Sequence, residues 1–159
     1  NIAANSTDKT FNLNFNHPII ELIFVIQNKS KSNSLPGGGK DYFNFSKTNE
    51  LPFKDPLKTA KILLNGTDRT PEMTNKELKY LQPIIYHTSI PNNFIYMYSF
   101  SLKPEDYQPS GSCNFSRFDN KQIKIELEED IEVSELKIFA LNYNILRITQ
   151  GLAGLAYLN

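Results

Sequence analysis

The sequence predicts an all-β protein, a sandwich or a jelly roll, on three observations. Phe, Tyr, Ile and Val, which favour strands, are abundant, and aromatic residues make up 12% of the chain. Turn-forming residues recur roughly every ten positions, as in proteins built from short strands. Only one segment has the pattern of a helix. About seven or eight short strands with one turn of helix are typical of such two-layered architectures.

Two strands near the start are defined by their apolar pattern. Phe11, Leu13 and Phe15 alternate with asparagines, which predicts a half-buried strand over residues 11–15 that a His-Pro pair ends. Residues 19–27 are apolar on both faces apart from Glu21. We therefore expect residues 19–27 to form an interior strand that is covered on both sides.

The remaining strands follow from shorter apolar runs. Asn65-Gly66 is the strongest turn signal in the chain and should close a tight turn after one of them. Asn142, Tyr143 and Asn144 interrupt the longest run, and the amide side chains of the two asparagines are expected to bond to neighbouring backbone. These strands are expected at residues 42–45, 57–64, 94–102, 122–127, 136–148 and 152–158.

The single helix is expected near residues 74–81. Thr74 can cap its first turn, and Glu77, three residues later, completes the pattern of a capping box. Pro83 should end the helix, because proline has no amide hydrogen to donate.

Composition limits the classes of function. The 159 residues suit one domain with a sizeable core. Lys plus Arg and Asp plus Glu number 17 each, so no net charge attracts nucleic acid. The longest apolar run, residues 22–26, is far shorter than the roughly 20 residues of a membrane span. The chain begins with Asn1 rather than Met and shows no signal peptide, so we expect a piece of a longer protein.

Patterns of catalytic or metal sites are weak. "PGGGKD" lacks the spacing of a phosphate-binding loop, and the polar loop 28–41 that contains it is read as surface. His17 and His87 have no neighbouring His or Cys, so we expect structural imidazoles. Because Cys113 is the one cysteine, an internal disulfide is excluded. We expect Cys113 to be a small buried side chain and not a nucleophile. The acidic run 126–135 lacks calcium-loop spacing and suggests a solvated turn. The prediction is a protein without enzymatic activity, metal or cofactor.

Residues 103–120 hold the densest group of special residues. Pro104, Pro109 and Gly111 are expected to set a corner between two strands, because proline fixes φ and glycine permits positive φ. Arg117 either pairs with a carboxylate or backbone carbonyls, or is an exposed arginine of little energetic consequence.

Asn-x-Ser/Thr triplets are candidate glycosylation acceptors if the protein is secreted, although an Asn-rich chain contains such triplets by chance. They occur at Asn5, Asn28, Asn44, Asn65 and Asn114.

Longer stretches resemble a known family. "HTSIPNNFIYMYSFSLKPEDYQPSGSCNFSRFDN" and "FALNYNILRITQGLAGLAYLN" look like the end of a major capsid protein of nucleocytoplasmic large DNA viruses, the iridovirus-, phycodnavirus- and mimivirus-like groups. "FNHPIIELIFVIQ" and "LLNGTDR" resemble segments of that family in the same order. The resemblance spans residues 11–159, nearly the whole chain.

The resemblance implies a double jelly-roll protein, with residues 1–159 as its C-terminal jelly roll. The family's second barrel begins with a further strand upstream of "FNHP" that this chain lacks, so an unpaired sheet edge is expected. Three copies would form a capsomer of an icosahedral shell, contacting neighbouring capsomers and minor capsid proteins but neither nucleic acid nor a small-molecule substrate. The protein would reside in the virion capsid after assembly in the host cytoplasm. Loops 28–41 and 66–75 are candidates for the outer surface, and Arg117 for the trimer seam.

Two other functions remain open from the residues. A carbohydrate-binding jelly roll for cell attachment is compatible with 8 Tyr and 11 Phe, although Trp is absent. A cupin-type metalloenzyme would require bound metal and converging ligands.

Overall fold

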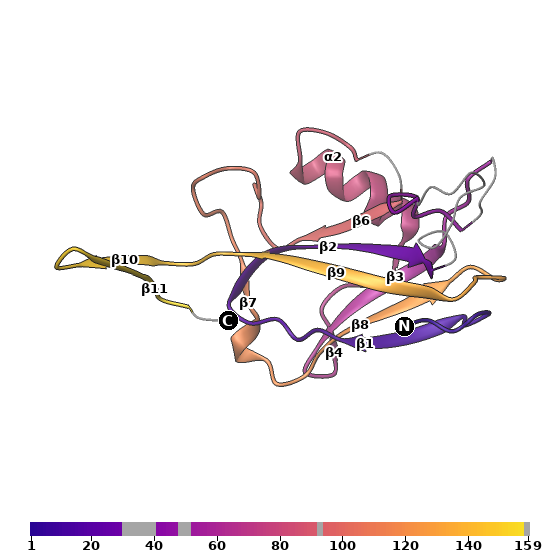
Figure 1. The fold of residues 1–159 in the computed structure, drawn as a ribbon, viewed down its shortest axis with the longest axis horizontal. Helices are drawn as coiled ribbons and strands as arrows, with labels where there is room; N and C mark the ends of the chain where they lie inside the picture. Colours follow the sequence, from indigo (N-terminus) through magenta and orange to yellow (C-terminus); the bar gives the residue numbers. More distant parts are fainter. Residues whose placement is uncertain (30–40, 48–51, 92–93, 158–159) are drawn as a thin grey trace.

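A computed structural model describes residues 1–29, 41–47, 52–91 and 94–157. Two antiparallel sheets pack face to face, and a two-stranded hairpin extends beyond them (Figure 1). The prediction of an all-β sandwich with one short helix is confirmed. The strands are β1 (Asp8–Asn12), β2 (Pro18–Asn28), β3 (Leu57–Leu64), β4 (Thr67–Asp68), β5 (Met73–Thr74), β6 (Ile95–Ser99), β7 (Cys113–Asn114), β8 (Lys121–Leu127), β9 (Ser134–Asn142), β10 (Leu146–Thr149) and β11 (Leu152–Leu155).

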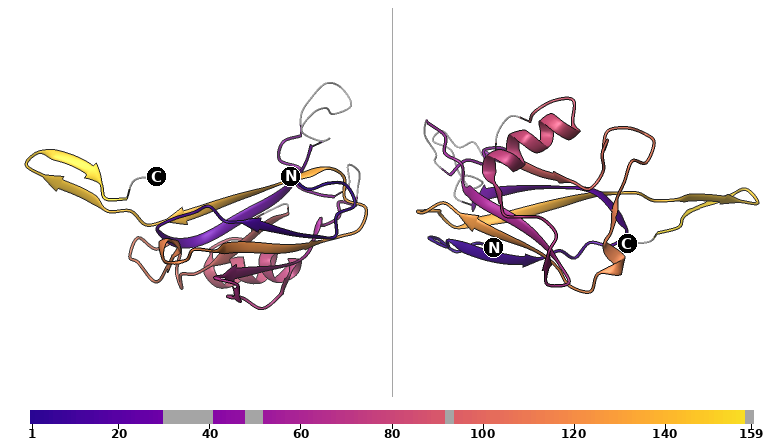
Figure 2. Two further views of the ribbon diagram at one scale, coloured as in Figure 1. Left: turned by 90° about the horizontal axis from the view of Figure 1, so that it is seen from below. Right: turned by 180° about the vertical axis from the view of Figure 1, so that it is seen from behind.

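Strand β2 is the centre of the first sheet, which we call the β2 sheet. It pairs with β6 along one edge and with β9 along the other, while β7 pairs with its first residues. The second sheet, the β8 sheet, has the order β1-β8-β3, and β4 and β5 pair with β3. Figure 2 shows from two further directions that the hairpin β10–β11 projects away from both sheets.

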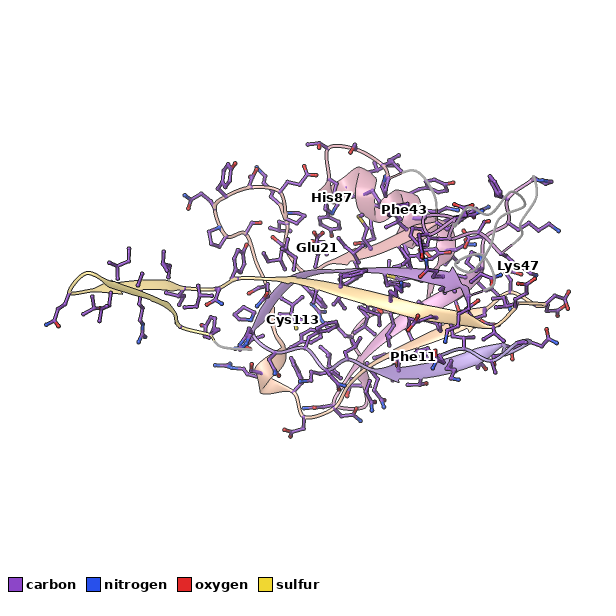
Figure 3. All side chains as sticks on the ribbon, in the orientation of Figure 1. Phe11, Glu21, Phe43, Lys47, His87 and Cys113 are labelled. Carbon is purple, nitrogen blue, oxygen red and sulfur yellow. The ribbon has the colours of Figure 1, made fainter. Side chains whose placement is uncertain are left out.

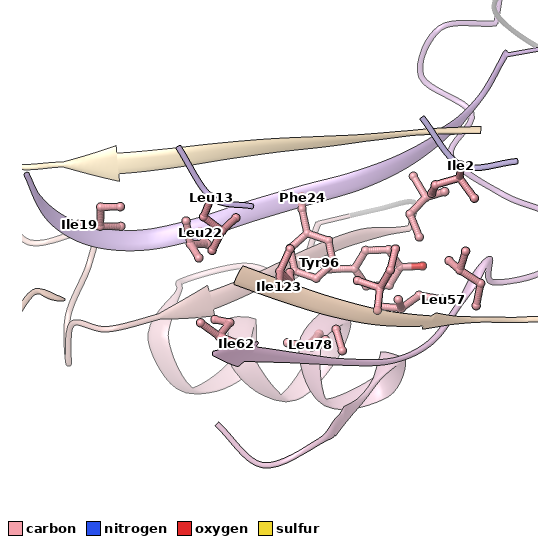
Figure 4. Packing of buried hydrophobic residues seen from close by; sticks show 14 of the residues in the cluster. Ile2, Leu13, Ile19, Leu22, Phe24, Leu57, Ile62, Leu78, Tyr96 and Ile123 are labelled. Atoms are coloured by element: carbon pink, nitrogen blue, oxygen red, sulfur yellow. The ribbon is translucent and has the colours of Figure 1, made fainter. Parts of the chain in front are cut away.

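The core fills the space between the two sheets. Inward residues of β2 meet inward residues of β8 and β3, because alternate side chains of a strand point to the same face. Phe24 stacks on Tyr96 with ring centroids 5.3 Å apart (Figure 4). Ile2 and Leu13 close the core from the N-terminal segment. The β2 sheet and β8 sheet supply most of the rest: Leu22, Ile26, Leu57, Ile62, Leu64, Ile123, Ile125 and Leu127.

Several strands end where local hydrogen bonds compete with the sheet. The run 136–148 is two strands rather than one, because β2 begins at Pro18 and the bond from the Tyr143 N–H to the Pro18 carbonyl, at 2.9 Å, is the last between them. The next free N–H, that of Ile145, donates to Asn144 Oδ1 at 2.8 Å. Strand β6 ends at Ser99, whose hydroxyl donates to the Ser101 carbonyl at 2.7 Å. The first strand occupies Asp8–Asn12 rather than residues 11–15, in register with β8.

Residues 42–45 form a turn, so the expectation of a short strand there was wrong. The backbone N–H and hydroxyl of Ser46 both donate to the Asn44 Oδ1 atom, at 3.1 and 2.6 Å. This local pairing satisfies groups that a strand would present to a neighbour. Residues 30–40 of the predicted loop 28–41 lie outside the described residues.

The helical segment is longer than expected. A π-helical turn (Glu77–Leu81) runs into α2 (Gln82–Tyr86), so Pro83 lies near the start of α2 instead of ending the helix. The wide turn is closed by a bond from the Gln82 N–H to the Glu77 carbonyl, five residues back. Such a turn accommodates proline, because the usual clash with the carbonyl four residues earlier is relieved.

The capping box is present. The Thr74 N–H donates to Glu77 Oε2 at 2.6 Å, and the Glu77 N–H donates back to the Thr74 hydroxyl at 3.4 Å. The bonds from Thr74 lower the pKa of the Glu77 carboxyl.

We predict that Phe24→Ala lowers the free energy of unfolding by about 3 to 5 kcal/mol, because it empties a fully buried aromatic site. Phe24 is 1% exposed, whereas Phe43 is 78% exposed. Phe43→Ala is therefore the matched control and should change stability by less than about 0.5 kcal/mol. Urea denaturation measures both. Equal losses in the two variants would show that the core is not where the structure places it.

Candidate functional site

The corner between β6 and β7 is held by serines and a glycine. The Ser110 Oγ atom accepts from the Lys103 N–H at 2.8 Å and lies 2.6 Å from the Ser101 hydroxyl. Gly111 has φ +136°, and a Cβ there would lie 3.2 Å from the Phe100 carbonyl oxygen. Pro104 is the second residue of a turn that the Asp106 N–H closes on the Lys103 carbonyl at 3.3 Å.

The structure places the other predicted corner residues at the surface. Pro109 is exposed, and Arg117 is exposed at the end of a 3-10 turn (Phe115–Arg117). No ion pair within the described residues involves Arg117. Its pairing with a group of another subunit therefore stays a prediction.

Asn65 and Gly66 link β3 to β4 and also brace the far end of the corner. Their φ values of 50° and 77° between the paired residues Leu64 and Thr67 describe a type I′ turn. The Asn65 Oδ1 atom accepts from the N–H groups of Asp119 and Asn120, both at 3.1 Å. The turn thus fixes the chain where it enters β8.

A histidine between two carboxylates lies on the outer face of the β2 sheet (Figure 3). His87 Nε2 is 2.9 Å from Glu21 Oε2, and His87 Nδ1 is 3.2 Å from Glu105 Oε1. The buried atoms Glu21 Oε2 and His87 Nε2 have no hydrogen-bond partner in the described part of the chain, so this ion-pair contact is their compensation. The Thr88 N–H donates to Glu105 at 3.1 Å and, with His87, lowers the pKa of the Glu105 carboxyl. The sequence reasoning foresaw a structural imidazole but not its partners.

A second buried polar group ties the helix to the core. Lys79 Nζ lies 2.6 Å from Asp55 Oδ2 and 4.6 Å from the centre of the Phe94 ring. The Tyr96 hydroxyl donates to Asp55, and burial together with the Asp55 charge raises the pKa of Tyr96 well above its usual value. A tyrosine held in its neutral form is a poor proton acceptor. This group joins the helix to the segment before β3 and to β6.

The described residues show neither an activated cysteine nucleophile nor a metal-binding cluster. Burial raises the pKa of the Cys113 thiol, which disfavours the reactive thiolate. No group of three or more His, Cys, Asp or Glu in the described ranges is arranged to hold a metal ion. The acidic run 126–135 contains the end of β8 and its connection to β9. None of the helices in the described ranges has the length and hydropathy to span a membrane.

The glycosylation triplets differ in accessibility. Asn28 is 4% exposed and its amide donates to Glu132 at 2.8 Å, so a glycan there would displace a buried bond. The triplet of Asn44 has its serine buried. Asn5, Asn65 and Asn114 are exposed and stay candidate acceptors.

Apolar surface dominates the outer face of the β2 sheet. A hollow of about 430 Å³ lies between this face and the turn at residues 41–47. Small-molecule sites usually combine an apolar lining with a few convergent polar groups. Here the lining is almost wholly apolar, which suits a protein contact better. It includes Ile23, Val25, Tyr42, Phe45, Ile95 and Phe139.

One edge of β9 is nearly unoccupied. Ser134 and Ile2 exchange two backbone hydrogen bonds of 2.8 and 3.1 Å on the edge opposite β2. Beyond Ile2, the described residues place no strand against this edge. An open edge of this kind is ready to pair with another strand.

Comparison with known proteins decides the family. The family model for the large eukaryotic DNA virus major capsid protein matches residues 1–154. The chain belongs to this family. The resemblance seen in the sequence is therefore confirmed.

Relatives of this capsid chain extend well beyond it. The major capsid protein of Pyramimonas orientalis virus is 32% identical over 97% of this chain and 40% of its own length. That of Paramecium bursaria Chlorella virus 1 is 32% identical over 99% of this chain and 45% of its own length. The chain thus spans less than half the length of these relatives.

Solved structures show the same fold. The quasi-atomic model of the PBCV-1 virus capsid matches with a TM-score of 0.78 and 31% identity, covering 99% of this chain and 49% of its own. The Faustovirus major capsid protein matches with a TM-score of 0.65 at 12% identity, which shows the fold alone. The jelly-roll prediction is confirmed.

We predict that His87→Ala destabilises the protein by about 3 kcal/mol, because it leaves the Glu21 carboxylate buried without its partner. Lys61→Ala, which breaks an exposed 2.9 Å pair with Asp68, should cost less than about 1 kcal/mol. Adding Glu21→Gln to His87→Ala should restore part of the loss. Urea denaturation of the single and double variants measures the coupling. Additive losses would contradict an ion pair.

Proposed function

We propose that the chain is the C-terminal jelly roll of a major capsid protein, a structural building block with no catalytic activity. The family match over residues 1–154 is the observation that carries this proposal. The rigid two-sheet fold and the apolar outer face of the β2 sheet support it, since a shell needs stiff walls and contact surfaces. The capsid relatives provide no support for the carbohydrate-binding alternative.

The proposed assembly is a homotrimer that tiles an icosahedral capsid with neighbouring capsomers and minor capsid proteins, after assembly in the host cytoplasm. No nucleic acid or small-molecule substrate is a partner. Arg117 is a candidate for the trimer seam because it is exposed at a corner. Residues 66–75, which include the short strands β4 and β5, are exposed at most positions although Thr70 is buried, and are candidates for the outer surface.

Light scattering on the purified full-length protein should give the mass of three chains, and the same protein should be a major component of purified particles. Trimers occur only if subunits bury enough complementary surface. A protein that stays monomeric at every concentration and is missing from particles would overturn the proposal. Binding to a glycan array without assembly would favour the carbohydrate-binding alternative instead.

We further propose that residues 1–159 form a single jelly-roll domain whose first strand precedes Asn1. Ile2 already pairs antiparallel with Ser134 at the open edge of β9. A segment continuing back from Ile2 in that register would run beside β9 toward Asn142. It would complete the β2 sheet and cover the edge that β9 leaves open.

Amide hydrogen exchange tests this strand. Because Ser134 directs its N–H to Ile2, the N–H groups of Leu136, Ile138 and Ala140 face the open edge, while those of Lys137 and Phe139 face β2. The first three amides should exchange slowly only in the full-length protein. The amides of Lys137 and Phe139 are internal controls and should exchange slowly in the full-length protein and in the isolated chain of residues 1–159. Fast exchange at Ile138 in the full-length protein would contradict the added strand.

A further inference from the structure

The β10–β11 hairpin is a ribbon without cover. It extends beyond both sheets (Figures 1 and 2), and every residue of its two strands is exposed. A two-stranded hairpin alone in water is marginally stable at best. Packing against another surface would therefore stabilise the ribbon.

One face of the ribbon is wholly aliphatic. Leu146 lies opposite Leu155, and Ile148 lies opposite Ala153, so these four side chains share a face. Leu146, Ile148 and Leu155 are 60%, 71% and 56% exposed. The other face is mixed and carries the only charge of the ribbon: Arg147, Thr149, Leu152 and Gly154.

The direction of this aliphatic face is set at the base of the ribbon. The Asn144 amide donates to the Tyr157 carbonyl at 3.0 Å, and the Tyr157 N–H donates back to Asn144 Oδ1 at 3.1 Å. The Tyr157 ring stacks on His17 with centroids 5.0 Å apart. At the tip, Gln150 and Gly151 have φ of 50° and 78°, which describes a type I′ turn. These contacts join the base of the ribbon to His17, the residue before β2.

The path of the chain before Asn1 leads to this base. Continuing the Ile2–Ser134 register, the residue eight positions before Ile2 would lie opposite Asn142, because 134 plus 8 is 142. Whatever precedes that strand would emerge beside Tyr143 and Asn144, where the ribbon begins. Relatives have more than half of their length outside the matched region.

We propose that the aliphatic face of the β10–β11 hairpin packs against the part of the same polypeptide that precedes Asn1, and thereby fastens the two halves of the protein together. This rests on the proposed domain order, in which another domain comes first. A partner tethered at the base of the ribbon has a high effective concentration there, which favours it over a second copy.

A photo-crosslinking amino acid in place of Ile148 tests the proposal in the full-length protein. The expected product keeps the mass of one chain on a denaturing gel and contains a peptide from before Asn1 joined to position 148. The same probe in place of Thr149, on the opposite face, is the matched control and should crosslink far less. A product with the mass of two chains would show that a second copy covers the ribbon, and absence of any crosslink would show a free ribbon. Either result overturns the proposal.

A paired substitution provides a second measurement. Leu146→Ser with Ile148→Ser should speed proteolysis at the junction before Asn1 by roughly tenfold, as expected when a contact worth about 1.4 kcal/mol is lost. Leu152→Ser, on the opposite face, should leave the rate unchanged. Light scattering separates this inference from the proposed function. A monomeric protein that still gives the one-chain crosslink would support the packing of the hairpin and contradict the trimeric capsomer. A trimeric protein without that crosslink would support the capsomer and contradict the packing of the hairpin.

Discussion

Strand β2 is the element on which the rest of the structure depends. Both of its edges are paired, by β6 and by β9, and nearly all of its residues are buried. Its inner face supplies Leu22, Phe24 and Ile26 to the core. Two elements partly cover its outer face. His87 contacts Glu21, and the Gln27 amide donates to the Tyr42 carbonyl of the turn at 2.8 Å. Strand β9, which has the open edge and leads into the exposed hairpin, is held in place by its pairing with β2.

The buried polar groups orient elements around that strand. Asp55, Lys79 and Tyr96 join the segment before β3, the helix and β6. Such groups contribute little net stability compared with apolar packing, but removing one partner is costly because the other stays buried and unpaired. They therefore favour one arrangement of the helix over its alternatives.

Three surfaces of the chain are candidates for contacts with other polypeptide segments. The apolar hollow on the β2 sheet, the open edge of β9 and the aliphatic face of the hairpin are three places where the isolated chain leaves contacts unmade. Proteins that act alone rarely expose apolar surface on this scale. In the proposed capsid subunit, neighbouring subunits and the remainder of the same polypeptide would supply contacts to these three surfaces. The membership in a capsid family agrees with that interpretation.

Local patterns in the sequence determined the all-β class, the buried β2, the bounds of β3, the capping box and the Asn65-Gly66 turn. Each of these depends on neighbouring residues, through alternation, capping or turn geometry. The sequence motifs also pointed to the family.

Only the tertiary structure decided that the run 136–148 divides into a sheet strand and a projecting ribbon, since β2 begins at Pro18, the last residue with which Tyr143 can pair. It also decided that His87 sits between Glu21 and Glu105, and that Ile2 meets Ser134 at an open edge. These pairs join residues 18 to 132 positions apart, and no local pattern encodes such distances. Long-range contacts form only when the two sheets pack, because burial of the apolar core brings them together.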